Sequence, residues 1–226
     1  MAKPWDVRLL TVEARLAQAK QKTDRLINHV CELVRLHESN RIITYSDAFS
    51  RQIPQSDAFK DFQQAMHSFE ITRLCALWDG PANDRESIPA VMHLIDDGQV
   101  LMAAEQAIAE GWKSRGRLDD FEQMKSTEIG SKLRRAVKVA RTIGKSKRLK
   151  RIQKFRHKYL AHSLTPPLVS NPKYGHERML VKASIEIVER LYLGLSNGGF
   201  EFSDVVRQAR CSAEQLWSNC TFSVPR

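Results

Sequence analysis

Residues 155 to 163 are Phe155-Arg156-His157-Lys158-Tyr159-Leu160-Ala161-His162-Ser163. This stretch sets an arginine and a histidine close together in one predicted helix, which begins after the capping residue Ser146 and must stop near Pro166. An imidazole can transfer a proton near neutral pH, and a guanidinium group can hold a phosphate that gains negative charge. The stretch therefore indicates phosphodiester chemistry on a helix.

Positive charge is concentrated around this stretch. The 226-residue chain has 36 Lys and Arg, 26 Asp and Glu, and a formal net charge of +10. Residues 129 to 176 contain 14 of these basic residues and no acidic one, so the rest of the chain has 22 basic and 26 acidic residues. A solvated helix face is the plain alternative, but the lack of balancing acids favours a polyanion as partner. The candidate contacts are Lys147, Arg148, Lys150, Arg151 and Lys154.

The remaining sequence predicts helices only. Apolar residues recur at steps of three and four from residue 5 to residue 37, where Ser39-Asn40 is expected to end the first helix, and residues 41 to 54 are expected to connect it to the next. Ser56 is expected to cap a second helix that stops at Asp79-Gly80-Pro81. Further helices are predicted at residues 87–95, 100–109, 118–143, 146–165, 177–195 and from Ser203 onward. No alternating strand pattern is sustained, so the predicted fold is an all-α bundle.

Residues 1 to 199 are expected to form one helical domain. Residues 200 to 226 are expected to add a C-terminal helix and tail that pack on the same domain. No run approaches the roughly 18 apolar residues of a membrane span, and the N-terminus lacks the apolar core of a secretory signal, so a cytoplasmic protein is expected.

Metal and cofactor chemistry has little support in the sequence. The four cysteines are scattered without C-x-x-C spacing, and free thiols are expected. The other histidines show no metal-ligand spacing with carboxylates, and no glycine-rich nucleotide motif occurs. We therefore expect neither a metal nor a cofactor.

The segment from Arg156 to His162 resembles the R-x(4-6)-H signature of the HEPN superfamily. The residues Ala161-His162-Ser163 are similar to the abortive-infection U-type branch of that superfamily, usually written AbiU2. A second point of similarity is Arg73-Leu74-Cys75-Ala76-Leu77-Trp78-Asp79, a leucine-rich turn that closes on an aspartate. The resemblance covers residues 5 to 195 and implies a HEPN-like helical bundle.

The resemblance implies a metal-independent RNA endonuclease that acts as a homodimer, in phage defence or in a toxin–antitoxin system with an antitoxin or defence partner. In such a reaction a ribose 2′-hydroxyl attacks the adjacent phosphate, which needs a base, an acid and a cation. His162 is the candidate for proton transfer and Arg156 for phosphate binding, with possible assistance from His157 and Lys158. The alternative is a non-catalytic RNA-binding or interaction module on the same scaffold.

Helix geometry limits how Arg156 and His162 can act together. In a continuous α-helix, two residues six positions apart point about 120° away from each other around the axis and lie roughly 9 Å apart along it. Either the helix is distorted, or two copies of the chain build a composite site across a two-fold axis, and we favour the second. Arg151 and His157 have the same spacing, so only the Ala-His-Ser context selects Arg156 and His162. The plain alternative for His162 is a histidine stabilised by the dipole at a helix end.

Overall fold

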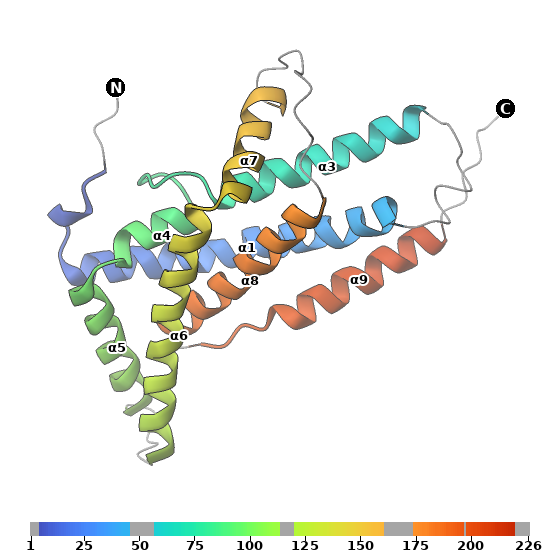
Figure 1. The fold of residues 1–226 in the computed structure, drawn as a ribbon. Helices are drawn as coiled ribbons and strands as arrows, with labels where there is room; N and C mark the ends of the chain where they lie inside the picture. The colour runs from blue at the N-terminus through green and yellow to red at the C-terminus, as the bar shows by residue number, and fades with distance from the viewer. Residues whose placement is uncertain (1–4, 46–56, 114–119, 161–173, 197, 220–226) are drawn as a thin grey trace.

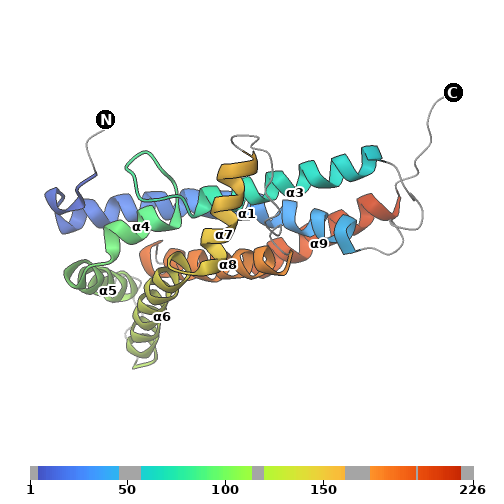
Figure 2. The same ribbon diagram turned by 45° about the horizontal axis from the view of Figure 1, so that its top comes forward.

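Helix α1, Val12–Tyr45, is the axis on which the other helices are arranged. Figures 1 and 2 show that α3, α8 and α9 lie along it, whereas α5 and α6 extend away from this layer. The computed structural model describes residues 5–45, 57–113, 120–160, 174–196 and 198–219. Over these residues the chain has eight α-helices and no strand, which confirms the all-α prediction. The others are α3 (Asp57–Leu77), α4 (Ile88–Ile95), α5 (Gly98–Lys113), α6 (Asp120–Gly144), α7 (Lys147–Phe155), α8 (Tyr174–Ser196) and α9 (Phe202–Ser218).

The core forms where α1 meets α3, α4 and α8. Leu26, Val30 and Leu33 of α1 are fully buried, as is Leu74 of α3. Burial of each such side chain contributes roughly 1.5–3 kcal/mol of transfer free energy. Because these residues recur at three- and four-residue steps, the same periodicity that predicted the helix also selects the face that it buries.

The first helix lies further along the chain than predicted, since it begins at Val12 and not at residue 5, and a separate 3₁₀ turn precedes it. Its expected end at Ser39-Asn40 is wrong, because α1 continues to Tyr45 and takes in the first part of the expected connection. Asn40 is buried, and its side-chain amide donates to Glu70 Oε2 at 2.6 Å and to the Met66 carbonyl at 3.2 Å. A residue that commonly ends helices is here a packing contact with α3. The predicted cap Ser56 lies outside the described residues.

Helix α9 packs along α1. Its buried residues are Phe202, Ala209 and Ala213, and Arg210 pairs with the buried carboxylate of Glu38 on α1 at 3.2 Å. The helix begins one residue before the expected Ser203. The domain boundary at residue 199 stays a prediction.

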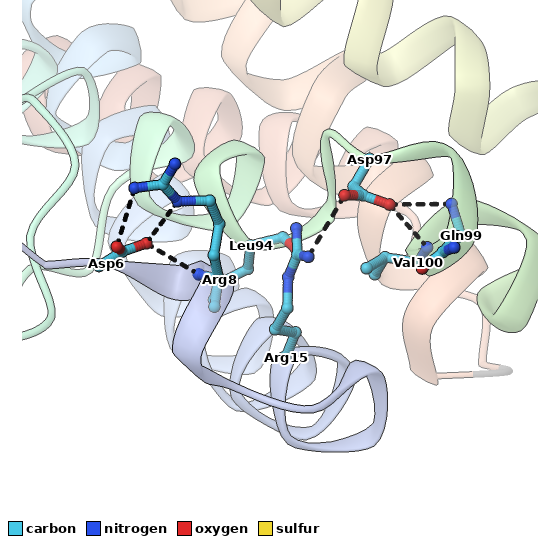
Figure 3. Close-up of polar contacts among 7 residues, drawn as sticks. All are labelled: Asp6, Arg8, Arg15, Leu94, Asp97, Gln99 and Val100. Carbon is cyan, nitrogen blue, oxygen red and sulfur yellow. Dashed lines mark hydrogen bonds and ion pairs between the residues drawn. The ribbon is translucent and has the colours of Figure 1, made fainter.

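Arg15 of α1 joins the end of α4 to the start of α5 (Figure 3). Its Nε donates to the Leu94 carbonyl at 2.8 Å, and its Nη1 pairs with Asp97 Oδ2 at 3.4 Å. Asp97 Oδ1 accepts from the backbone N–H groups of Gln99 at 2.9 Å and Val100 at 3.4 Å, and these bonds lower the pKa of the Asp97 carboxyl. One buried arginine thus caps α4 while its carboxylate partner caps α5.

A surface ion pair precedes α1 in the same view (Figure 3). Asp6 accepts two hydrogen bonds from the Arg8 guanidinium, both at 2.9 Å, and one from the Arg8 backbone N–H at 3.0 Å. These bonds lower the pKa of Asp6 to about 2. The pair closes the short 3₁₀ turn Val7–Leu9 that leads into the helix.

Helices α6 and α8 approach closely. A Cβ atom on Gly194 would lie 3.1 Å from the Leu133 side chain, so glycine permits this contact. Helix α6 ends at Gly144, as predicted, and α7 starts after Ser146, whose Oγ accepts from the Leu149 N–H at 3.2 Å. Figure 1 shows α7 rising from the end of α6 toward α3. This turn places α7 at the surface.

Candidate functional site

Helix α7 has one buried and one basic face. Leu149 and Ile152 are buried against the bundle, and the predicted contact residues all lie exposed on the rest of the helix. They are Lys147, Arg148, Lys150, Arg151 and Lys154. Arg148 Nη1 lies 3.2 Å from Met179 Sδ. Among the residues that the structure describes, none of these five cations pairs with a carboxylate. Their charge is therefore available to a partner.

Arg156 lies at the end of α7 and pairs with Asp79, which follows α3. The distances are 3.1 Å from Nη2 to Oδ1 and 3.3 Å from Nη1 to Oδ2. Two parallel bonds fix the plane of a guanidinium group as a single contact cannot. Both side chains remain about 30% exposed, at 30% and 29%. Arg156 is thus held in one orientation and is accessible from solvent.

The position of Asp79 is fixed by its neighbour Trp78. Trp78 is buried, its indole N–H donates to Ser184 Oγ at 2.9 Å, and its carbonyl accepts from Gln153 Nε2 at 3.0 Å. Helices α7 and α8 therefore both hold the residue before Asp79. The ion pair between Arg156 and Asp79 is built on a buried support.

Cys75 lies one helical turn before Asp79 but has no nucleophilic role. It is fully buried, and burial raises the pKa of its thiol to about 12. A thiol reacts as its thiolate, so Cys75 stays inert near neutral pH. The reactive features at this surface are the cations.

The chain changes from α-helix to π-helix at the motif itself. Residues Arg156–Leu160 form a π-helical turn directly after α7. The helix is thus distorted over these residues, which is the alternative that we did not favour, and the 120° argument does not apply to them. The composite site of two copies stays a prediction. Single π-helical turns inside helices are frequent at functional sites.

The other predicted site residues differ in what surrounds them. His157 is exposed and Lys158 is half-buried in the π-helical turn. His162 lies outside the described residues. The structure brings Arg156 together with Asp79, a contact across 77 residues that the sequence analysis did not predict.

Two pairs of a partly buried histidine with a buried carboxylate were also missed. His37 Nδ1 lies 2.6 Å from Glu70 Oε1, and His67 Nε2 lies 2.7 Å from Glu177 Oε2. Both carboxylates are almost fully buried. The three-residue spacing of His67 and Glu70 on α3 was the available signal, because it places both on one helix face. Within the described ranges no group of three or more His, Cys, Asp or Glu side chains is arranged to hold a metal.

The geometry first defines a class: all-α proteins that present one strongly basic helix and an oriented, accessible arginine at its end. The family model described as AbiU2, of the HEPN superfamily, matches residues 12–216. The chain therefore belongs to the AbiU2 family of HEPN domains, which confirms the resemblance and the HEPN-like helical bundle. Comparisons with curated proteins and with solved structures gave no match. No helix in the described part of the chain is long and apolar enough to cross a membrane.

Proposed function

We propose that this protein is a metal-independent RNA endonuclease in which Arg156 binds the scissile phosphate and His162 transfers protons. The observation that carries the proposal is the oriented, accessible Arg156 at the end of an acid-free basic helix, within a chain of the HEPN superfamily. A guanidinium group held in one plane suits the phosphate that gains charge during cleavage.

The reaction begins when the ribose 2′-hydroxyl loses its proton and attacks the adjacent phosphorus. The bond to the 5′-oxygen of the next nucleotide then breaks, and that oxygen takes up a proton, which leaves a 2′,3′-cyclic phosphate. His162 serves the proton transfers, and Arg156 stabilises the phosphorane charge. DNA lacks the 2′-hydroxyl and is not cleaved by this route.

Asp79 acts on Arg156 as a positioning residue. Its two bonds hold the guanidinium group before RNA binds, and part of the group remains exposed. Phosphate oxygens then share or replace these bonds. Orientation in advance lowers the entropy lost on binding, and the carboxylate weakens unspecific attraction of anions.

We further propose that two copies of the chain form the active unit. A two-fold axis that brings the motif segments of two chains together lets Arg156 of one act with His162 of its partner. His157 and Lys158 assist by contacting neighbouring phosphates. A monomer with full activity would contradict this arrangement.

The exposed cations of α7 hold the RNA strand on either side of the cleaved bond. We place the protein in the cytoplasm, in prokaryotic phage defence or in a toxin–antitoxin system. There an antitoxin or defence partner restrains its activity. A basic helix that attracts any RNA makes such restraint necessary.

The test is to incubate the protein with RNA in the presence of EDTA and to compare alanine variants of the two possible motif registers. We expect Arg156→Ala and His162→Ala each to reduce cleavage by at least about a hundredfold. Arg151→Ala and His157→Ala have the same spacing and serve as matched controls, with reductions below about tenfold. Cleavage that survives both Arg156→Ala and His162→Ala contradicts the proposal.

The second candidate function is RNA binding without cleavage. The five exposed cations of α7, which pair with no carboxylate in the described ranges, favour it, because they account for RNA affinity without any reaction. Binding by the parent protein without cleavage, under conditions where the dimer is populated, would select this function.

A further inference from the structure

A cavity of about 370 Å³ lies between α4 and the C-terminal end of α6. Its apolar wall includes Ile88 and Met92 from the α4 side and Val137 and Ala140 from α6. Volumes of this order are typical of small-molecule sites, which are mostly apolar with a few polar groups. The cavity is thus large enough for a ring system and has the lining for one.

The cavity is held open by fixed walls. Ile88 and Val137 are buried in the core, so their positions do not depend on a ligand. At the rim, Arg141 binds both oxygens of Asp96, with Nε 3.0 Å from Oδ2, and this pair connects α6 to the end of α4. The small side chain of Ala140 leaves the space between the two helices empty.

The rim of the cavity carries two cations, Arg141 and Lys145, and one carboxylate, Asp96, which is paired with Arg141, so its net charge is positive and comes from Lys145. Arg141 and Lys145 are both exposed, and both belong to the segment without acidic residues. Lys145 forms no ion pair with the carboxylates in the described part of the chain. A flat apolar ring linked to an anionic group fits such a site, and a nucleotide has that chemistry.

The cavity adjoins the candidate catalytic surface. Trp78 contributes to the cavity wall, and the next residue, Asp79, holds Arg156. The Trp78 carbonyl also accepts the hydrogen bond from Gln153 of α7. Two consecutive residues, Trp78 and Asp79, therefore connect the cavity wall to the arginine at the candidate site.

We infer that this cavity takes one unpaired base of the bound RNA, with an adjacent phosphate on Arg141 and Lys145. The inference rests on the proposed function, because it assumes that RNA lies along α7. Proteins commonly read single-stranded RNA by placing an unstacked base in a pocket. The cavity then determines which base stands next to the cleaved bond.

The first experiment measures binding of the four nucleoside 5′-monophosphates by isothermal titration calorimetry in EDTA. We expect saturable binding of at least one of them to the parent protein. Ala140→Leu fills the cavity and should weaken binding at least about tenfold. Arg141→Ala and Lys145→Ala should each weaken it about threefold or more, whereas Lys138→Ala, on an exposed part of α6 outside the cavity, should change it less than about twofold.

Thermal unfolding followed by circular dichroism shows whether Ala140→Leu folds. If it does not, the variants Arg141→Ala and Lys145→Ala still test the inference, because both side chains are exposed. Absence of binding for all four nucleotides overturns the inference. The inference is also overturned if a folded Ala140→Leu variant binds nucleotides with unchanged affinity. The same holds if Lys138→Ala and Lys145→Ala lose equal affinity.

The second experiment separates RNA from a free nucleotide as the occupant. Products from a random-sequence RNA pool are sequenced for the parent protein and for Ala140→Leu. A changed base preference beside the cut supports the inference. An unchanged preference, despite lost mononucleotide binding, assigns the cavity to a free nucleotide and overturns the RNA assignment. If the parent protein binds mononucleotides but cleaves no RNA, the proposed nuclease function fails and the cavity remains a nucleotide site.

Discussion

The cations of α7 and those of α1 and α3 differ in how their charge is balanced. Several arginines of α1 and α3 pair with carboxylates, as in Arg25 with Glu86, Arg15 with Asp97 and Arg73 with Glu32. On α7, the five exposed cations have no carboxylate partner among the described residues. Arg156 is intermediate between these two groups, since it pairs with Asp79 and yet remains accessible from solvent.

This difference separates cations whose charge is neutralised by a carboxylate of the same chain from cations without such a partner among the described residues. A paired surface cation contributes little to stability, typically below about 1 kcal/mol, but it also contributes little long-range attraction. An unpaired cluster attracts polyanions over about a Debye length, roughly 10 Å at 0.1 M salt. The same residue type therefore has two uses in one chain, and removing it has different effects in the two regions.

The largest expected effect tests the α7 side of this comparison. We expect RNA affinity to fall about a hundredfold or more when Lys147, Lys150, Arg151 and Lys154 are all replaced by alanine, because four phosphate contacts are lost. The slope of log affinity against log salt should fall by about 0.7 for each lost contact with single-stranded RNA. Fluorescence anisotropy with a labelled RNA, measured over a series of salt concentrations, checks both values.

A second fourfold variant is the matched control. It replaces Arg25 and Arg41 of α1, Arg73 of α3, and Arg210 of α9, which pairs with Glu38 of α1. All four pair with carboxylates, so the variant removes the same formal charge. Its salt slope should stay within about 0.7 of the parent value, since no phosphate contact is lost. Equal slopes for the two fourfold variants would remove the distinction between the two regions.

The next effect concerns stability on the α1 and α3 side. Glu70 is almost fully buried and bonds to His37 and to the Asn40 amide, both at 2.6 Å. Glu70→Ala removes the carboxylate from His37 and leaves the Asn40 amide with only the Met66 carbonyl, so we expect it to lower the free energy of unfolding by about 3 kcal/mol. Urea denaturation followed by circular dichroism measures the change.

The exposed Lys150→Ala provides the contrast and should change the same free energy by less than about 0.5 kcal/mol. Glu70→Gln retains an acceptor oxygen, and we expect it to lose less than Glu70→Ala. A cost for Glu70→Ala below about 1 kcal/mol would contradict the role given to this buried network.

Local signals in the sequence predicted the helices well. Ser87 and Ser146 cap α4 and α7 through their side-chain oxygens, and Gly144 ends α6, all as predicted from residue type and position. The predicted end of α1 was wrong because a hydrogen bond to Glu70, 30 residues further along the chain, holds Asn40 inside the helix. Helix ends that depend on such tertiary contacts have no local signature.

The candidate site was predictable in part. The acid-free window and Arg156 are visible in the sequence because charge and motif spacing are local properties. The contact of Arg156 with Asp79 depends on how α7 packs beside the end of α3, and the π-helical turn depends on the same packing. The cavity beside Trp78 likewise arises where α4 meets α6.

The smallest expected effect is the pH dependence contributed by Glu177, which is buried at the start of α8. Burial raises the pKa of Glu177 above its usual 4.5, although the hydrogen bond and the charge of His67 act in the opposite direction. The nearby charge of Glu70 also raises this pKa, and that of His37 lowers it. The folded state therefore binds more protons than the unfolded state between the unfolded and folded pKa values, so the free energy of unfolding falls as the pH rises through that window.

Glu177→Gln removes this titration while keeping an acceptor for His67. We expect the stability of the parent protein, relative to Glu177→Gln, to decline as the pH rises from about 4.5. The same comparison in a His67→Gln background should show an equal or steeper decline, because the imidazole that lowers the pKa of Glu177 is absent. Urea denaturation at several pH values measures the difference, and parallel pH profiles for parent and variant in both backgrounds would contradict it.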